Sequence, residues 1–329
     1  MKAKLNRAVR FAAMGGAVAG TAAAAAVAAS PVLRDELRRF GHLARPLHPR
    51  EPGAPVPPPL PEGRVVNLPG RGEVFIRDTG GDLPPVLLLH GWTLSADLNF
   101  FAVFGPLSQR HRVVALDLRG HGRGLRSPEP FSLEDCADDA AALLEVLGLG
   151  PAVVVGFSLG GAVAMLLCHR HPEQVAGLVF SATALDWQDS AQRLVWRSMA
   201  LFEVALRNGT GDGIAERVVR DIVEECPELE PYADWATGEF RRGYPTDLAG
   251  AGRALSAYDG RPLAPGVDVP ASVVVTAQDQ LVRPQKQREL ALAVRARVFE
   301  LDADHTAPFN RGREFALLLA QAVEAVSAS

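Results

Sequence analysis

The sequence predicts an α/β fold: a mostly parallel, eight-stranded sheet with helices on both faces and a helical cap inserted after the sixth strand. Short runs rich in valine and leucine alternate with longer helical patterns, as in sheets whose parallel strands are joined by crossover helices. These runs are almost entirely apolar, which is typical of strands buried on both faces. Between residues 187 and 262 no such run occurs, and helical stretches there hold three of the four tryptophans, so we expect the cap in this interval.

The individual elements follow from these patterns in chain order. The eight expected strands are Arg64–Leu68, Glu73–Asp78, Pro85–His90, Arg112–Asp117, Ala152–Gly156, Val175–Ser181, Ala271–Thr276 and Ala296–Leu301. The clearest helical patterns are Leu133–Leu147, Leu159–His171, Gln285–Val294 and Arg311–Val326. A turn of proline and glycine at residues 69–72 joins the first two strands, and we expect these strands to form an antiparallel hairpin at one edge of the sheet.

The composition is that of a globular protein with one large core. Of the 329 residues, 48% are hydrophobic and 22% are charged, which suffices for an α/β core that carries an insertion. The net charge of -4 gives no reason to expect nucleic acid as a partner. Cys136, Cys168 and Cys226 do not form a disulfide framework, and no histidine or cysteine spacing indicates a metal site. Neither a G-x-G-x-x-G run nor a P-loop is present, so we expect no metal and no cofactor.

The N-terminus predicts a segment separate from the folded domain. Basic residues near the start are followed by an uncharged, alanine-rich stretch, so we expect residues 1–33 to be a secretory signal or a membrane anchor. Residues 34–62 are rich in proline and arginine and should form an extended linker. Residues 63–329 then form the α/β domain, with the cap at about 187–262. This organisation predicts an exported or membrane-anchored protein of the cell envelope; the alternative is an alanine-rich helix on a cytoplasmic protein.

The pentapeptide after the fifth expected strand, residues 156–160 (GFSLG), has the G-x-S-x-G spacing of a nucleophile elbow. A serine between a strand and a helix occupies a strained turn that exposes its hydroxyl above the sheet. The glycines are expected because a Cβ there would collide with the neighbouring strand and helix. The same turn places the backbone N–H of Leu159 at a helix N-terminus, where a developing oxyanion is stabilised. Ser158 is therefore the candidate nucleophile.

A serine nucleophile needs a general base, and the candidate is His305. This histidine follows the last expected strand, in a loop of the kind where sites form at the carboxyl ends of parallel strands. We interpret His90 as a structural turn residue, while His121 lies in a glycine-containing loop after the fourth strand. The remaining histidines lie in the N-terminal stretch, at the far end of the helix that Ser158 begins, or at the opposite edge of the sheet: His42, His48, His111, His169 and His171.

The acid that orients the base is expected to be Asp279, in the loop after the seventh strand. Serine, acid and histidine then follow one another in an order that differs from the orders of chymotrypsin-like and subtilisin-like enzymes. Asp186, after the sixth strand, is the alternative, because an acid there could also reach the histidine. Asp302 and Asp304 flank the histidine, but neighbouring side chains diverge, and we interpret both as solvated loop carboxylates.

These segments together resemble the α/β-hydrolase fold family, among its serine esterase-like and lipase-like members. The match covers about four fifths of the chain and is carried by His90-Gly91-Trp92, Asp117–Gly122 (DLRGHG), Gly156–Gly161, Thr276–Val282 and Asp304–Pro308. The resemblance implies that Trp92, the residue after His-Gly, donates the second N–H of an oxyanion hole, beside that of Leu159. The chain departs from the family pattern at Ala277 and Asp304, where glycine is frequent, and at Gly124-Leu125, where a serine is usual.

The expected function is that of a serine hydrolase that cleaves a carboxyl ester or a related acyl bond through an acyl-enzyme, with Ser158, Asp279 and His305 as the triad. Aromatic residues of the cap favour a small substrate with an apolar acyl or alcohol group, although most of them also suit packing of the cap onto the core. Lactone, thioester or C–C bond hydrolysis and perhydrolysis are alternatives on the same triad. The alternative from another class is a membrane-tethered, non-catalytic binding protein on a hydrolase fold; such proteins commonly lose a triad member. The oligomeric state is left open.

Overall fold

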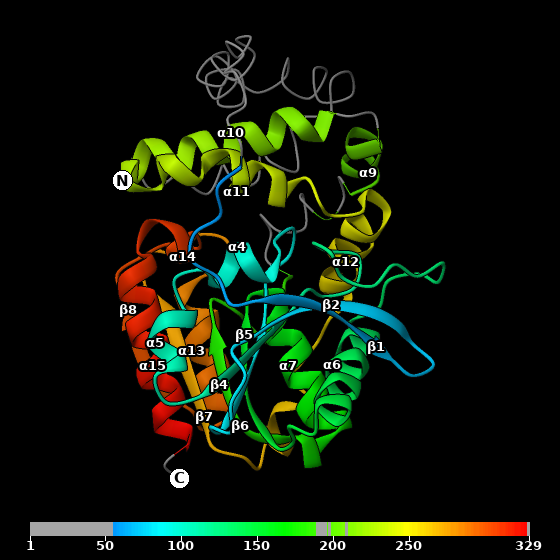
Figure 1. Cartoon of the computed structure of the whole chain (residues 1–329). Coiled ribbons are helices and arrows are strands. Elements are labelled where there is room, and N and C mark those ends of the chain that lie inside the picture. The colour runs from blue at the N-terminus through cyan, green and yellow to red at the C-terminus, as the bar shows by residue number, and fades with distance from the viewer. Residues whose placement is uncertain (1–54, 189–195, 197–198, 208–209, 328–329) are drawn as a thin grey trace.

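The computed structural model describes residues 55–188, 196, 199–207 and 210–327 (Figure 1). In this part of the chain, eight strands form one sheet in the order β1-β2-β4-β3-β5-β6-β7-β8. Their bounds are β1 Gly63–Leu68, β2 Gly72–Asp78, β3 Pro85–Leu89, β4 Arg112–Leu116, β5 Ala152–Phe157, β6 Val175–Ser181, β7 Ala271–Thr276 and β8 Arg297–Leu301. The pairings β1–β2 and β2–β4 are antiparallel, and all pairings from β4 to β8 are parallel. The prediction of a mostly parallel, eight-stranded sheet with an edge hairpin is confirmed.

Helices cover both faces of this sheet. Their bounds are α4 Ala96–Phe100, α5 Phe104–Ser108, α6 Leu133–Leu147, α7 Leu159–Arg170, α9 Met199–Arg207, α10 Thr210–Glu225, α11 Ala233–Phe240, α12 Pro245–Ala257, α13 Pro284–Ala293, α14 Ala307–Asn310 and α15 Gly312–Ser327, with 3-10 turns η2 Pro172–Gln174, η3 Pro227–Tyr232 and η4 Ala264–Gly266. Leu89 and Val154 point into a core formed with α6, α7 and α13, whereas Leu88 and Val155 point into a second core formed with α5 and α15. Because successive strand residues face opposite sides, a strand between two cores must be apolar throughout, as the sequence pattern predicts.

The helices α4 and α5, between β3 and β4, have no counterpart among the expected elements. Each has only five residues, so the sequence contains too few turns for a helical period to be recognised. A local signal for α4 does exist, because the side chain of Ser95 caps the helix by accepting the backbone N–H of Leu98 at 3.2 Å. His90 and Asp117, expected as the last residues of their strands, lie one residue beyond β3 and β4 and belong to the loops that follow.

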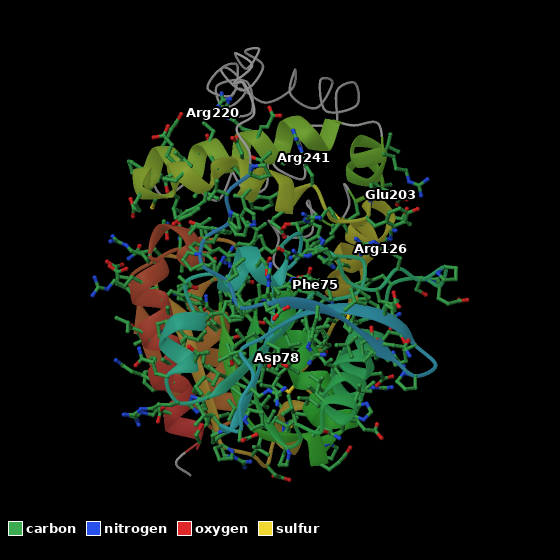
Figure 2. All side chains as sticks on the ribbon, in the orientation of Figure 1. Phe75, Asp78, Arg126, Glu203, Arg220 and Arg241 are labelled. Carbon is green, nitrogen blue, oxygen red and sulfur yellow. The ribbon has the colours of Figure 1, made fainter. Side chains whose placement is uncertain are left out.

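The helices α9, α10, α11 and α12, here called the inserted helices, lie between β6 and β7 and together occupy one end of the sheet (Figure 1). Within the described residues of 187–262 no strand occurs. The inserted helices contact loops that leave the carboxyl ends of parallel strands. The indole N–H of Trp92, after β3, donates to Leu248 O of α12 at 2.7 Å, and the N–H of Tyr244 donates to Gly120 O, after β4, at 2.9 Å. Arg126, labelled in Figure 2, joins the loop after β4 to the connection between α11 and α12 by donating to Arg242 O at 2.9 Å.

A buried cluster of charges fastens α11 to the core. Glu239 of α11 is 3% exposed and accepts hydrogen bonds from Arg123 at 3.1 Å and from Ser95 Oγ at 2.8 Å. Arg123 also pairs with Asp97 at 2.9 Å and with Asp117 at 3.1 Å. Removing one member would leave buried charges without a partner, which is strongly destabilising. The cluster therefore fixes the position of α11 over α4.

The N-terminal signal or anchor, expected at residues 1–33, lies outside the described residues, as does most of the linker. Residues 55–62 contain no helix or strand. The end of this stretch nevertheless packs on the domain: Pro58 is buried, Leu60 contacts the second core, and Pro61 O accepts a hydrogen bond from Arg77 at 2.8 Å. The packed domain therefore begins a few residues before the expected boundary at 63. Among the described residues, no helix combines the length and the apolarity that crossing a membrane requires.

Candidate active site

The candidate nucleophile lies in a sharp turn between β5 and α7. Ser158 has φ 52° and ψ -115°, a backbone conformation that non-glycine residues rarely adopt. Three hydrogen bonds hold it: the N–H of Ser158 donates to Ser181 O at 2.9 Å, while its carbonyl accepts from Gly161 N–H at 2.9 Å and from Thr183 Oγ1 at 2.7 Å. Strain of this kind persists only where the surroundings impose it, and it is concentrated at functional sites. The elbow expected from the pentapeptide is the geometry observed.

Glycine is required around this turn because backbone atoms approach too closely for a side chain. A Cβ on Gly156 would lie 2.3 Å from Gly160 O, and a Cβ on Gly160 would lie 2.0 Å from Leu89 O, on the neighbouring strand. A Cβ on Gly161 would lie 2.4 Å from the side chain of Thr183. Since the first two contacts involve backbone oxygens, no side-chain rotation can relieve them.

We expect Gly160→Ala to destabilise the protein by about 3 kcal/mol or more, because the strand and the helix would have to separate. Gly238→Ala is the matched control. Gly238 is exposed within α11, and a Cβ there would meet nothing within 4 Å. Alanine at this position should stabilise the helix by about 0.5–1 kcal/mol. Urea unfolding of both variants measures the two effects, and a destabilised Gly238→Ala or a wild-type-like Gly160→Ala would contradict the packing described.

The structure brings the three expected triad residues into contact. His305 Nε2 lies 3.1 Å from Ser158 Oγ, and His305 Nδ1 lies 2.7 Å from Asp279 Oδ2. The side chains of His305 and Asp279 are 10% and 0% exposed, and Ser158 is 6% exposed. A carboxylate can only accept, so Nδ1 carries the imidazole proton and Nε2 keeps a lone pair toward the serine hydroxyl. This is the protonation pattern that a general base requires.

A ring of donors holds the carboxylate of Asp279 in place. Its Oδ1 accepts the backbone N–H groups of Leu281 at 2.8 Å and Val282 at 2.9 Å, and its Oδ2 accepts Thr276 Oγ1 at 2.9 Å besides the imidazole. Behind Thr276 lies Gln287 of α13, which is fully buried. The side chain of Gln287 accepts Thr276 N–H at 3.0 Å and donates to Thr276 Oγ1 at 2.8 Å. Hydrogen bonds therefore connect the loop that contains Asp279 to α13 as well as to β7.

The alternative acid, Asp186, is engaged elsewhere. Its carboxylate pairs with Lys286 of α13. Burial raises the pKa of Asp186, but hydrogen bonds from Lys286 and from the backbone of Gln188 outweigh burial and leave the pKa below its usual value. Lys286 also donates to the backbone carbonyl of Asp186 at 3.1 Å. Lys286 therefore holds both the carboxylate and the carbonyl of this residue.

The two aspartates beside the histidine differ from one another. Asp302 is exposed and accepts a hydrogen bond from Gln278, as expected of a solvated carboxylate. For Asp304 the expectation of a solvated carboxylate is wrong. Asp304 is only partly exposed, and its Oδ1 accepts from the N–H of Thr306 at 2.9 Å, from Thr306 Oγ1 and from Asn310 Nδ2 at 3.2 Å. It stabilises the turn that carries His305 into α14.

Two other histidines, His90 and His121, form a buried pair next to the loops of the site. Their ring centroids lie 5.4 Å apart, and both rings are fully buried. His90 Nε2 accepts the N–H of Leu118 at 2.9 Å, so Nδ1 carries the proton and donates to Gly91 O at 2.8 Å. Burial lowers the pKa of His90 to about 4 and that of His121 to about 3. Both rings are neutral at pH 7 and bind a proton in the folded protein only under strongly acidic conditions.

We expect this pair to make folding stability depend on pH. In the unfolded chain a histidine has a pKa near 6.5, so below pH 6.5 the unfolded state binds protons that the native His90 and His121 do not. Stability is therefore fully present above pH 6.5 and falls as the pH drops toward the folded values. From pH 6.5 to 5 the loss should be on the order of 3 kcal/mol. Asp78 and Asp138, whose pKa values lie at about 2, lose their contribution only below about pH 4 and do not affect this window.

Urea unfolding at pH 7, 6 and 5 tests this expectation. A His121→Gln variant should lose a large part of the pH dependence, because one of the suppressed protonations is removed. A wild-type unfolding free energy that stays constant from pH 6.5 to 5 would contradict the assignment of neutral, buried rings.

The loop after β3 lies directly against the candidate nucleophile. A Cβ on Gly91 would be 3.4 Å from Ser158 Cβ, so the Gly91–Trp92 peptide and the serine hydroxyl are neighbours. Leu159 is the first residue of α7, and its N–H belongs to the unpaired N-terminal turn of that helix. The N–H groups of Trp92 and Leu159, the two expected oxyanion donors, therefore come from segments on either side of Ser158.

The tryptophans of residues 187–262 divide into two kinds. Trp187 and Trp235 are 2% and 9% exposed and pack edge-on against Tyr258 and Phe101, respectively, at centroid distances of 5.7 and 6.2 Å. These two rings fasten the inserted segment to the core. Trp196 is only partly buried and lies 5.7 Å from the ring of Trp92. Around this second pair gather the apolar residues Met199, Leu248 and Ala249.

Among the described residues, no group of three or more histidine, cysteine or acidic side chains is placed to hold a metal ion. Cys136, Cys168 and Cys226 are buried free thiols, and burial raises the pKa of each. A thiol whose pKa is raised carries little thiolate at pH 7 and is a poor nucleophile. None of the three is therefore a competitor of Ser158.

Comparison with known proteins agrees with this geometry. The family model described as alpha/beta hydrolase fold matches residues 84–311, more than half of the chain. The protein belongs to the α/β-hydrolase fold family. A pimeloyl-[acyl-carrier protein] methyl ester esterase of Chromobacterium violaceum is 30% identical over 252 residues, which cover 75% of this chain and 97% of the relative. A bifunctional esterase/perhydrolase of Acinetobacter calcoaceticus is 39% identical over 101 residues, 30% of this chain and 37% of the relative.

Solved structures give the same picture. The enol-lactonase of Burkholderia xenovorans superimposes with a TM-score of 0.69 at 26% identity, over 79% of this hydrolase and 100% of that chain. A thermophilic esterase of Thermogutta terrifontis superimposes with a TM-score of 0.68 at 26% identity, over 80% of this chain and 99% of that chain. These relatives are esterases and lactone hydrolases by name, and the present protein is a hydrolase of the same fold.

Proposed function

We propose that this hydrolase cleaves carboxyl esters by nucleophilic catalysis, with Ser158, Asp279 and His305 as its triad. The observation that carries the proposal is the unbroken chain of contacts from Asp279 Oδ2 through the imidazole to Ser158 Oγ, at 2.7 and 3.1 Å. A non-catalytic protein on this fold would gain nothing from a strained serine, a buried acid and a histidine of the required tautomer held in hydrogen-bonding contact. The intact set therefore favours an enzyme over a tethered binding protein.

The mechanism follows from the positions of the atoms. His305 Nε2 takes the proton of Ser158 Oγ as the oxygen attacks the substrate carbonyl, and Asp279 stabilises the imidazolium that forms. The N–H groups of Trp92 and Leu159 donate hydrogen bonds to the carbonyl oxygen as negative charge develops on it. The tetrahedral intermediate collapses when the imidazolium gives its proton to the leaving alcohol. Water, deprotonated by His305, then attacks the acyl-serine, and the same steps release the carboxylic acid and restore Ser158.

The substrate class is an ester with a small, apolar acyl or alcohol group. Trp92, Trp196 and the apolar residues Met199, Leu248 and Ala249 gather beside the proposed oxyanion loop and would exclude water from the reaction. In this proposal the inserted helices form the cap over the site. A lactone is the second candidate, because an enol-lactonase is among the similar structures and a lactone carbonyl meets the same nucleophile.

Release of nitrophenol from short-chain nitrophenyl esters, and covalent labelling by a fluorophosphonate, test the proposal. We expect hydrolysis and stoichiometric labelling of Ser158. A panel of methyl esters, lactones and thioesters of equal chain length then separates the substrate candidates. A folded protein that neither turns over any of these compounds nor reacts with the fluorophosphonate would contradict the proposed function.

We also propose that residues 1–33 direct the enzyme to the cell envelope, on the basis of the basic start and the uncharged stretch that follows it. Fractionation of cells that produce the full chain tests this point. Recovery of the enzyme in the soluble cytoplasmic fraction with its first residues intact would contradict it.

A further inference from the structure

The loop that leaves β3 contains backbone strain beside the nucleophile. Thr93 has φ 64°, in the left-handed region that a β-branched residue very rarely adopts. Such a conformation is unfavourable and persists only when neighbouring groups impose it. Thr93 follows the Gly91–Trp92 peptide, whose N–H is the proposed oxyanion donor. A group that fixes the orientation of this peptide therefore also fixes the direction of the proposed oxyanion donor.

Two side chains hold Gly91 from opposite ends of its backbone. Asn99 of α4 accepts the N–H of Gly91 on Oδ1 at 2.8 Å, and His90 Nδ1 donates to Gly91 O at 2.8 Å. The carbonyl of Gly91 and the N–H of Trp92 belong to one planar trans peptide, so they point in opposite directions. Fixing the backbone of Gly91 thus fixes the direction of the Trp92 N–H. That peptide lies against Ser158, as the 3.4 Å approach of a Gly91 Cβ to Ser158 Cβ shows.

The side chain of Asn99 contains a buried polar group that destabilises the fold, so a contribution to stability does not explain its presence. Asn99 is 1% exposed, and its Nδ2 has no hydrogen-bond partner in the part of the chain that the structure describes. A buried amide donor without a partner is destabilising, because it has lost its hydrogen bonds to water. Only the oxygen of this amide is hydrogen-bonded, and its one hydrogen bond among the described residues comes from the N–H of Gly91. Costs of this kind are tolerated where a group serves function.

We propose that Asn99 is a positioning residue of the oxyanion hole: it holds the strained loop so that the N–H of Trp92 faces the oxygen that becomes negatively charged. Asn99 does not touch the reacting atoms and acts through Gly91. The proposal deepens the proposed ester hydrolysis and rests on it. Because preorganised donors stabilise the transition state more than the bound ester, the loss of Asn99 should lower kcat and leave KM nearly unchanged.

Two variants of similar volume test this role. Asn99→Leu removes the acceptor, and we expect kcat for a nitrophenyl ester to fall about 10- to 100-fold with KM within about threefold of wild type. Asn99→Asp keeps an oxygen that can accept the N–H of Gly91 and replaces the unpartnered Nδ2 with a second carboxyl oxygen, so it should recover part of the lost kcat. A trifluoromethyl ketone, which a serine nucleophile converts to a tetrahedral oxyanion, should bind Asn99→Leu more weakly by a factor similar to the fall in kcat.

Gln174→Leu is the matched control. Gln174 also has a buried amide atom without a partner in the described residues, Oε1, but it lies before the amino end of β6, the end opposite Ser158. This variant should keep wild-type kcat and inhibitor affinity. Circular dichroism and thermal unfolding establish that each variant is folded, and Asn99→Ser replaces Asn99→Leu if the latter does not fold.

The outcomes separate this inference from the proposed function. A folded Asn99→Leu or Asn99→Ser with wild-type kcat and inhibitor affinity overturns the role of Asn99 while leaving ester hydrolysis intact. Equal losses in Asn99→Leu and Asn99→Asp also overturn it, because the acceptor oxygen would then be irrelevant. A wild-type enzyme that is inactive on every ester overturns the proposed function, and the role of Asn99 with it.

Discussion

Ser158→Ala should abolish ester hydrolysis, with kcat falling about 10⁵- to 10⁶-fold. The substitution removes the hydroxyl that lies 3.1 Å from His305 Nε2 and leaves the rest of the turn in place. Residual turnover above the rate in water would come from the oxyanion donors and from substrate binding alone. Steady-state rates with a nitrophenyl ester measure the effect, and fluorophosphonate labelling should disappear in parallel.

The matched control is Ser272→Ala. Ser272 lies in β7, is fully buried, and has a hydroxyl oxygen without a hydrogen-bond partner among the described residues. Removing that hydroxyl should leave kcat unchanged and unfolding stability equal or higher, because a buried unpaired polar group is lost. Hydrolysis by Ser158→Ala at a rate near that of Ser272→Ala would exclude Ser158 as the nucleophile.

The strands of the sheet could be predicted because consecutive residues repeat the same signal, an apolar side chain. The inner parallel strands lie between two cores, so runs such as residues 152–157 are apolar at every position. The ends of all eight strands deviate from the expected ends by one residue at most. The short helix α4 carried no such signal, and Asn99 was therefore missed. Only the N-cap at Ser95 marks this helix in the sequence.

The triad residues were accessible to sequence reasoning because each one follows a strand at the carboxyl end of the sheet. Topology alone brings such loops together. The residues that support the triad and the oxyanion loop lie inside helices instead: Gln287 in α13 and Asn99 in α4. Each acts through hydrogen bonds that form only when the chain is folded. No spacing in the sequence distinguishes Gln287 from the other polar residues of its helix. Supporting polar contacts of this type depend on tertiary structure and had to be read from coordinates.

The loop containing Asp304 shows the same limit. Sequence proximity to His305 suggested only that its side chain diverges from the imidazole. What the sequence did not show is the turn of α14, in which Asp304 accepts hydrogen bonds from Thr306 and Asn310. This turn, rather than a glycine at position 304, determines the direction in which the chain enters α14 and α15. The departure from the family pattern is thus compensated by local hydrogen bonds.

Asp279→Asn should lower kcat about ten-thousand-fold. An amide at this position can present its NH₂ group to His305 Nδ1, which then becomes the acceptor and moves the imidazole proton to Nε2. In that tautomer the ring cannot take the proton of Ser158, although the heavy-atom geometry is kept. The two backbone donors, Leu281 and Val282, would still hold the remaining amide oxygen, so the fold should be little changed. Steady-state kinetics together with urea unfolding measure both effects.

Asp186→Asn decides between the two candidate acids. Asp186 is paired with Lys286, and the loss of its charge should weaken that ion pair and lower the midpoint of urea unfolding slightly. Its kcat should stay within about threefold of wild type, since Asp186 supplies nothing to His305 in this geometry. The assignment of Asp279 would fail if Asp186→Asn lost activity by orders of magnitude while Asp279→Asn did not. The expected result is the reverse, because the imidazole lies 2.7 Å from Asp279 and the tautomer of His305 depends on that one contact.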